Sequence, residues 1–150
     1  MRFQDYLLQK LDYSYWANHK VAQSMTVDDR EVLRLFTHMV EAQLHWLKKL
    51  RGDREDYPEA GCSTADVVSE RLHGAYTLFR LWLSEQDDRH LLVDVHVAEG
   101  RPAIKAYEII DHVLFHDTYH RAQAILRLHE HGIANSGTDY DDFCTERHSA

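Results

Sequence analysis

The stretch HVLFHDTYHRAQAILRLHEHG, residues 112–132, decides the fold class, because it is long, contains no proline and has its single glycine at the end. Its apolar residues recur every three or four positions, as they do on one side of an α-helix. Gly132 is typical of the residue that follows a helix C-terminus. The helical pattern extends back to about Lys105, so the sequence predicts a final helix over residues 105–131.

Three upstream segments show the same helical spacing of apolar residues. These segments are approximately residues 3–25, 29–50 and 63–86. The expected N-caps are Thr26 or Asp28 for the second helix and Ser63 or Thr64 for the third, and Gly52 is the expected end of the second. Four helices of about 20 residues predict an all-α four-helix bundle. We expect a single domain over residues 1–150.

Residues 90–104 interrupt the helical pattern before the last helix. Apolar residues alternate with other residues from Leu91 to Val97, and the turn-forming sequence Glu-Gly-Arg-Pro follows. This pattern predicts a short β-strand and turn, or a hairpin. Residues 133–150 predict a polar tail, in which Tyr140 and Phe143 are candidate anchors.

Composition argues against nucleic-acid and membrane partners. The chain has 25 acidic and 17 basic residues, a formal charge of −8, and its densest basic cluster at residues 48–54 also contains acidic residues. Phosphate contacts supply most nucleic-acid affinity, so we expect no nucleic acid. No apolar run approaches the ~20 residues of a membrane span. Cys62 and Cys144 are isolated in the sequence, which is typical of a reduced, cytoplasmic protein.

Histidines on two predicted helices form a candidate metal site. His116 and His120 lie four residues apart, so they project from one helix face and can bind the same ion. Pairs with this spacing also occur by chance. The second helix offers His38 and His45, which are seven residues apart and share nearly one face. Periodicity slightly favours His38 as a third ligand and leaves His45 open.

Three segments resemble the DinB-like proteins, in the same order and over nearly the whole chain. They are LDYSYWANHKVAQSM (11–25), FTHMVEAQLHWLKKLRG (36–52) and HVLFHDTYHRAQAILRLHEHGIANSGTDYDDF (112–143). The shared features are Trp-Ala-Asn, a His eight residues before a Trp, and H-x3-H followed by Arg. The sequence departs from the family at Phe115, which is often Asn, and at Ala122, which is often Gly.

The resemblance implies that His38, His116 and His120 are metal ligands, because these residues match the family's ligands. Three neutral imidazoles suit Zn²⁺ or Ni²⁺ and leave a position open for water or substrate. A fourth ligand could come from Glu41, His45, His112 or the tail. The resemblance also implies a homodimer, which the apolar arcs of the second and third helices would allow.

The same resemblance suggests the chemistry. Family members include thiol-dependent transferases, so it implies a metal-dependent transferase that joins a low-molecular-weight thiol to a small-molecule electrophile, or a hydrolase. The alternative is a non-enzymatic metal-binding or stress-response module with a structural ion. Tyr119 could donate a proton to the bound group, although we expect a packed side chain. Arg121, on the other side of the helix, is expected to form a structural ion pair.

Two further hypotheses have less support in the sequence. A di-iron bundle needs carboxylates and two Glu-x-x-His motifs, and the chain offers only residues 70–73 and, as a distant second, residues 117–120. A cysteine nucleophile needs a neighbouring histidine, yet Cys62 and Cys144 lie in a predicted loop and in the tail. The three tryptophans are interpreted as core residues; they are Trp16, Trp46 and Trp82.

Overall fold

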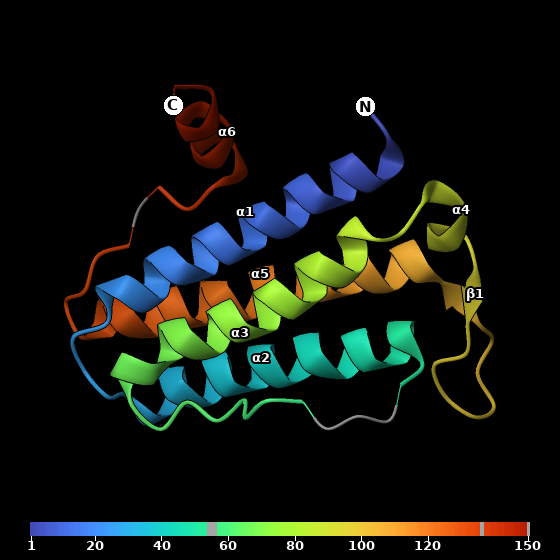
Figure 1. Ribbon diagram of the computed structural model, residues 1–150. Coiled ribbons are helices and arrows are strands. Elements are labelled where there is room, and N and C mark those ends of the chain that lie inside the picture. The colour runs from blue at the N-terminus through green and yellow to red at the C-terminus, as the bar shows by residue number, and fades with distance from the viewer. Residues whose placement is uncertain (54–56, 136, 150) are drawn as a thin grey trace.

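Six helices and one short hairpin make up the part of the chain that the computed structural model describes, residues 1–53, 57–135 and 137–149. The elements are α1 (Phe3–Ser24), α2 (Arg30–Arg51), α3 (Ala65–Ser84), α4 (Asp88–Leu91), β1 (Asp94–Val95), β2 (Ile104–Lys105), α5 (Ala106–Glu130) and α6 (Tyr140–Ser149). The long helices α1, α2, α3 and α5 lie side by side and confirm the predicted all-α bundle (Figure 1).

The long helices are arranged so that consecutive ones are not always neighbours. α2 packs against α3 and α5, and α1 packs against the same two helices. α1 and α2, which follow each other in the chain, therefore occupy diagonal corners of the bundle (Figure 1). α5 lies between them and contacts both, so its position depends on side chains from α1 and α2.

The hairpin that was predicted for residues 90–104 is present but shorter than expected. β1 pairs antiparallel with β2, with Asp94 opposite Lys105 and Val95 opposite Ile104. His90 and Leu91, the first two residues of this predicted segment, belong instead to the helical turn α4 (Asp88–Leu91), because Asp87 accepts a hydrogen bond from the His90 N–H and caps that turn.

The predicted polar tail contains the helix α6, which the sequence analysis missed. α6 lies outside the bundle beside α1 (Figure 1). Phe143 is its buried residue, and the Phe143 ring lies 5.7 Å from that of Tyr13 and 5.5 Å from that of Trp16. The Tyr140 ring also packs against the Tyr13 ring, with 5.1 Å between the ring centroids. Both predicted anchors therefore hold the C-terminal segment against α1.

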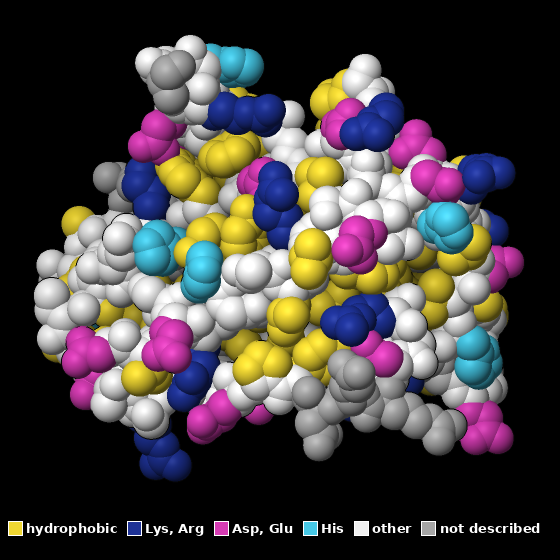
Figure 2. All heavy atoms as spheres, in the orientation of Figure 1, with side chains coloured by type: hydrophobic (Ala, Val, Ile, Leu, Met, Phe, Trp, Pro, Cys, Tyr) yellow, Lys and Arg dark blue, Asp and Glu magenta, His cyan; other side chains and the backbone are white. Residues whose placement is uncertain are grey.

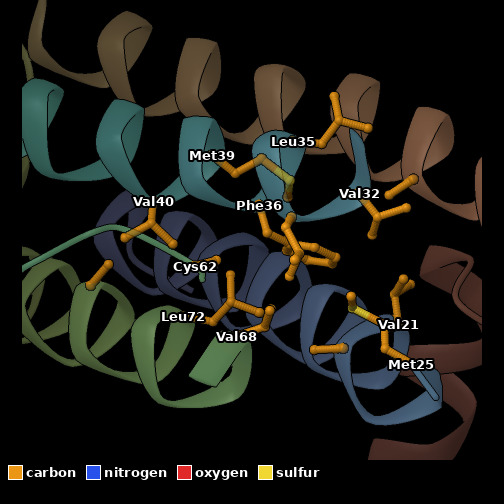
Figure 3. Packing of buried hydrophobic residues seen from close by; sticks show 14 of the residues in the cluster. Val21, Met25, Val32, Leu35, Phe36, Met39, Val40, Cys62, Val68 and Leu72 are labelled. Atoms are coloured by element: carbon orange, nitrogen blue, oxygen red, sulfur yellow. The ribbon is translucent and has the colours of Figure 1, made fainter. Parts of the chain in front are cut away.

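The core consists of two clusters of buried apolar side chains. Phe36, Met39 and Val40 of α2 point into one of them and meet Val68 and Leu72 of α3 (Figure 3). Burial of each large side chain stabilises the fold by roughly 1.5–3 kcal/mol. The apolar arcs of α2 and α3 are thus used inside the bundle. The tryptophans are only half-buried and lie at the edges of the core.

On the face shown in Figure 2, basic side chains are interspersed with acidic ones and form no continuous basic surface. In the described ranges, no helix combines the length and the apolar character that a membrane crossing requires.

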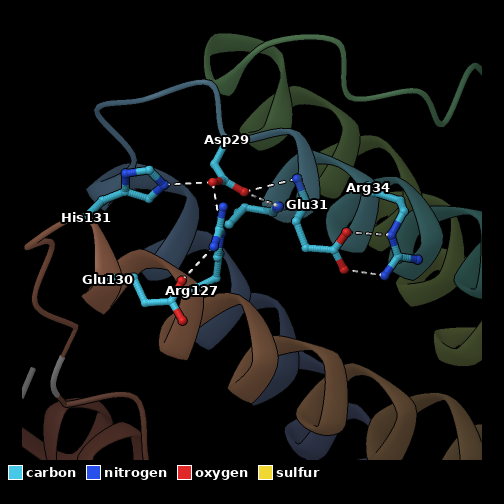
Figure 4. A network of polar contacts seen from close by, with 7 residues as sticks. Asp29, Glu31, Arg34, Arg127, Glu130 and His131 are labelled. Atoms are coloured by element: carbon cyan, nitrogen blue, oxygen red, sulfur yellow. Dashed lines mark hydrogen bonds and ion pairs between the residues drawn. The ribbon is translucent and has the colours of Figure 1, made fainter.

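The N-cap of α2 is Asp29, and the prediction of Thr26 or Asp28 was wrong. Asp29 Oδ1 accepts hydrogen bonds from the backbone N–H groups of Glu31 and Val32, both at 3.0 Å. Its other oxygen, Oδ2, accepts from Arg127 Nε at 3.0 Å and lies 2.7 Å from His131 Nε2 (Figure 4). One carboxylate therefore caps α2 and ties it to the C-terminal end of α5, a contact that no local pattern predicts.

The hydrogen bond with His131 is the main reason why the pKa of Asp29 is lowered to about 2 from an ordinary value of 3.8. A carboxyl group with a lowered pKa in the folded state stabilises the fold above its unfolded pKa. That stabilisation is lost as the pH falls from about 4 towards 2.

We expect Asp29→Asn to keep the cap, because Asn is an equally good N-cap, and Asp29→Ala to lose it, at a further cost of about 1 kcal/mol. Urea unfolding of both variants should give the order wild type, Asn, Ala at pH 7. The difference between wild type and Asp29→Asn should shrink as the pH is lowered to 2.5. A difference that does not change with pH would show that the ion pairs of Asp29 contribute nothing.

Candidate metal centre

Three histidines from two helices meet where α2 packs against α5. His38 lies on α2, and His116 and His120 lie one turn apart on α5. One ring nitrogen from each residue lies within 4.8 Å of the other two. The closest pair is His38 Nε2 and His116 Nε2, at 3.0 Å. The side-by-side packing of α2 and α5 thus brings together all three residues that the sequence analysis selected.

The donor set fits a divalent metal ion of borderline softness. Nitrogens bound to one zinc ion at about 2.0–2.1 Å lie roughly 3–3.5 Å apart, which agrees with the His38–His116 spacing. The pKa of His116 is lowered to about 4, mainly by burial and then by the nearby His120 and His38. His116 is therefore neutral at physiological pH, which is the form that coordinates a metal.

The second ring nitrogen of His116 differs from that of most metal-bound histidines, which donates a hydrogen bond to a neighbouring group. His116 Nδ1 is buried and has no hydrogen-bond partner within the described residues. Its Nε2 faces His38 and would be the ligand atom. All three rings are half-buried, so each is held on one side by the protein and reaches solvent on the other.

The candidate fourth ligands lie outside the group of three. Glu41 and His45 are exposed on α2. The His112 ring lies 5.9 Å from that of His116, and it packs edge-on against Trp46 at 5.1 Å. Among the described residues, no fourth His, Cys, Asp or Glu joins the group.

Tyr119 is not packed, contrary to expectation. Its side chain is 63% exposed, and its ring lies 5.1 Å from the ring of His120. The phenol is therefore free to approach a group that binds next to His120.

A buried polar network positions the helix that carries two of the histidines. Asp117 Oδ2 accepts hydrogen bonds from Ser14 Oγ at 2.9 Å, Asn18 Nδ2 at 3.2 Å and Gln43 Nε2 at 2.7 Å. Burial raises the pKa of Asp117 to about 6. Because the donors come from both α1 and α2, they fix the rotation and the height of α5.

Arg121 belongs to the same network, but it donates hydrogen bonds to neutral groups and does not form the predicted ion pair among the described residues. Its guanidinium donates to Asn18 Oδ1 at 2.9 Å and to the Tyr13 hydroxyl at 3.1 Å. Within the described ranges no carboxylate oxygen lies in direct ion-pair contact with it. Asn18 and Arg121 are part of the motifs shared with the DinB-like proteins. No motif or spacing in the sequence, however, predicted that Asp117 and Ser14 would belong to a buried network.

The other candidate groups do not form a comparable site. His73 is exposed on α3, and Asp117 is buried in the network just described, so the residues of a di-iron site are not brought together. Cys62 is packed in the core, and burial raises the pKa of its thiol. Three acidic residues at α6 also lie close together, but exposed acidic groups of this kind are common without an ion.

Comparison with known proteins supports the resemblance. Searches of curated proteins and of solved structures found no significant match. The model of the DinB family matches residues 5–148, which include the three histidines and, apart from the first two residues of α1, all four long helices. The chain therefore belongs to the DinB family.

Proposed function

We propose that the protein binds one divalent metal ion through His38, His116 and His120. The observation that carries this proposal is the approach of three imidazole nitrogens to within 4.8 Å of one another, on helices of a DinB-family fold. Nitrogen ligands favour Zn²⁺ or Ni²⁺ over Mg²⁺ or Ca²⁺. Affinity alone would not select either of them against Cu²⁺, so the supply of metal decides.

We further propose that the centre catalyses the transfer of a low-molecular-weight thiol to a small electrophile. A bound ion supplies Lewis acidity, which lowers the pKa of a coordinated thiol or water. The thiol loses its proton to buffer, its sulfur forms a bond to the electrophilic carbon, and the leaving group departs with the bonding electron pair. The buried thiol of Cys62, with its raised pKa, is a poor nucleophile, and Cys144 lies on α6, which packs against α1, so we expect the nucleophile to be borrowed.

Two side chains beside the histidines would assist. The exposed Tyr119 side chain, whose ring lies 5.1 Å from that of His120, can donate a hydrogen bond to the leaving group. Trp46 packs against His112, whose ring lies 5.9 Å from that of His116, and would add an apolar surface next to that histidine. If water replaces the thiol, the same centre is a hydrolase. If neither reacts, the ion serves the fold alone, because its ligands join α2 to α5.

The outer face of α5 is a candidate homodimer interface. Every exposed residue between positions 115 and 126 is uncharged. Phe115, Tyr119 and Leu126 are 70%, 63% and 66% exposed. Interface centres are depleted in charge and rich in aromatic residues, and a chain with a charge of −8 can approach a second copy most easily through an uncharged face. A second copy packed against this face would lie next to the metal centre.

Metal binding is tested directly by metal analysis of dialysed protein. We expect one ion per chain in wild type and in His45→Ala, and none in His38→Ala, His116→Ala or His120→Ala. Titrations should show weaker binding as the pH falls below an ordinary imidazole pKa of ~6.5, because protonated imidazole cannot coordinate. Metal retained by His38→Ala but lost from His45→Ala would refute the assignment on α2.

Catalysis is tested with metal-loaded wild type and His116→Ala, each assayed with low-molecular-weight thiols and model electrophiles. We expect thiol-dependent turnover that is at least tenfold lower in the variant. Turnover in water alone would indicate a hydrolase. Equal background rates in both proteins, with a melting temperature that rises on metal binding, would indicate a structural ion.

Light scattering tests the interface. We expect wild type to be a dimer at micromolar concentration, and Leu126→Glu to dissociate at that concentration because it places a charge in the face. Leu81→Glu is the matched control, because Leu81 is 58% exposed on α3, away from this face. A monomeric wild type, or equal effects of the two substitutions, would refute the proposed interface.

A further inference from the structure

His120 has a protein partner on the ring nitrogen that faces away from the candidate ion. His120 Nδ1 lies 2.7 Å from Gln123 Oε1. Gln123 is three residues further along α5, so the contact is made within one helical turn and does not depend on another element. His116 differs, since its Nδ1 is buried and without a partner within the described residues.

This contact determines where the proton of His120 resides. An amide oxygen can only accept a hydrogen bond, so Nδ1 must carry the proton. The lone pair is then on Nε2, the nitrogen left free for a metal ion. A free neutral imidazole in water prefers the opposite form, with the proton on Nε2. Gln123 therefore holds His120 in the form that is less common in solution.

The contact between His38 and His116 has the opposite character. Their Nε2 atoms are 3.0 Å apart, and a hydrogen bond at this distance needs a proton on one of them. In the ion-free protein, one of these two rings therefore carries its proton on the nitrogen that would bind the ion. His120 therefore already has a free lone pair on Nε2, whereas either His38 or His116 must lose the proton from its Nε2 before it can bind an ion.

We infer that Gln123 is a positioning residue that sets the Nδ1–H form and the ring orientation of His120, so that Nε2 faces the metal ion. This inference rests on the proposed function, because it gives His120 the role of a ligand. Groups that contact the far nitrogen of a metal-bound histidine typically change metal affinity 10–100-fold when they are removed.

The first test needs no metal. Long-range ¹H–¹⁵N correlation spectra of the metal-free, ¹⁵N-labelled protein at pH 8 distinguish the two neutral forms of each histidine, and the His120 signals are identified by their loss in His120→Ala. We expect the Nδ1–H form in wild type and in Gln123→Glu, which keeps an oxygen acceptor. Gln123→Leu should shift His120 towards the Nε2–H form. An Nε2–H form in wild type would overturn the inference.

The second test is zinc affinity, measured by competition with a chelator. We expect Gln123→Leu to bind 10–100-fold more weakly, and Gln123→Asn, whose shorter side chain draws the amide back from the ring, to bind more weakly than wild type. Gln123→Glu should retain the wild-type affinity or exceed it. Gln23→Leu, the same change at an exposed glutamine of α1, should have no effect.

The outcomes separate this inference from the proposed function. Zinc binding that depends on His120 but is unchanged in Gln123→Leu would overturn the role of Gln123 and leave the metal centre intact. Zinc binding that survives His120→Ala would overturn His120 as a ligand. The spectra would still decide whether Gln123 sets the proton position of His120.

Discussion

The register of α5 depends on the buried carboxylate of Asp117, because one of its oxygens accepts hydrogen bonds from Ser14 and Asn18 of α1 and from Gln43 of α2. An α-helix turns by about 100° per residue, so a slip of one residue would point Asp117 away from these donors. The same slip would rotate His116 away from His38. The geometry of the candidate metal centre is therefore linked to a polar contact in the middle of the bundle.

The composition of this network explains how a bundle with apolar faces specifies one arrangement. Apolar side chains tolerate many packings of similar energy, whereas a buried polar group is costly unless it meets its partners. Burial raises the pKa of Asp117 to about 6, which means that the environment disfavours the charged carboxylate. Arg121, hydrogen-bonded to Asn18 in the same network, supplies the compensating positive charge.

The features that depend on residues close in sequence were predicted correctly. The predictions were wrong or missing where contacts between distant residues determine the structure. The four long helices follow from apolar periodicity, and the end of α2 at Gly52 follows from its left-handed backbone, with φ of 66°. The N-cap was wrong by one residue, because Asp29 is selected partly by Arg127 and His131 at the end of α5. α6 was missed because its contacts with Tyr13 and Trp16, rather than its own polar composition, hold it in place.

The same reasoning explains the histidines. His38 and His45 differ by only about 20° around α2, because seven residues nearly complete two turns. Which of these two histidines meets His116 and His120 therefore depends on the height at which α5 crosses α2. The family resemblance identified His38, whereas periodicity favoured it only slightly.

The surface of α5 has three sectors, one buried, one exposed and one half-buried. The metal centre lies in the half-buried sector, at the edge of the core. One sector, which includes Val113 and Asp117, is buried, and another, which includes Phe115 and Leu126, is exposed and uncharged. His116 and His120 lie between these sectors, where the protein holds a ring on one side and solvent reaches it on the other. A ligand deeper in the core would be rigid but closed to substrate, and one further out would be accessible but poorly oriented. At this boundary a short contact such as that of Gln123 with His120 can supply the orientation that packing alone does not.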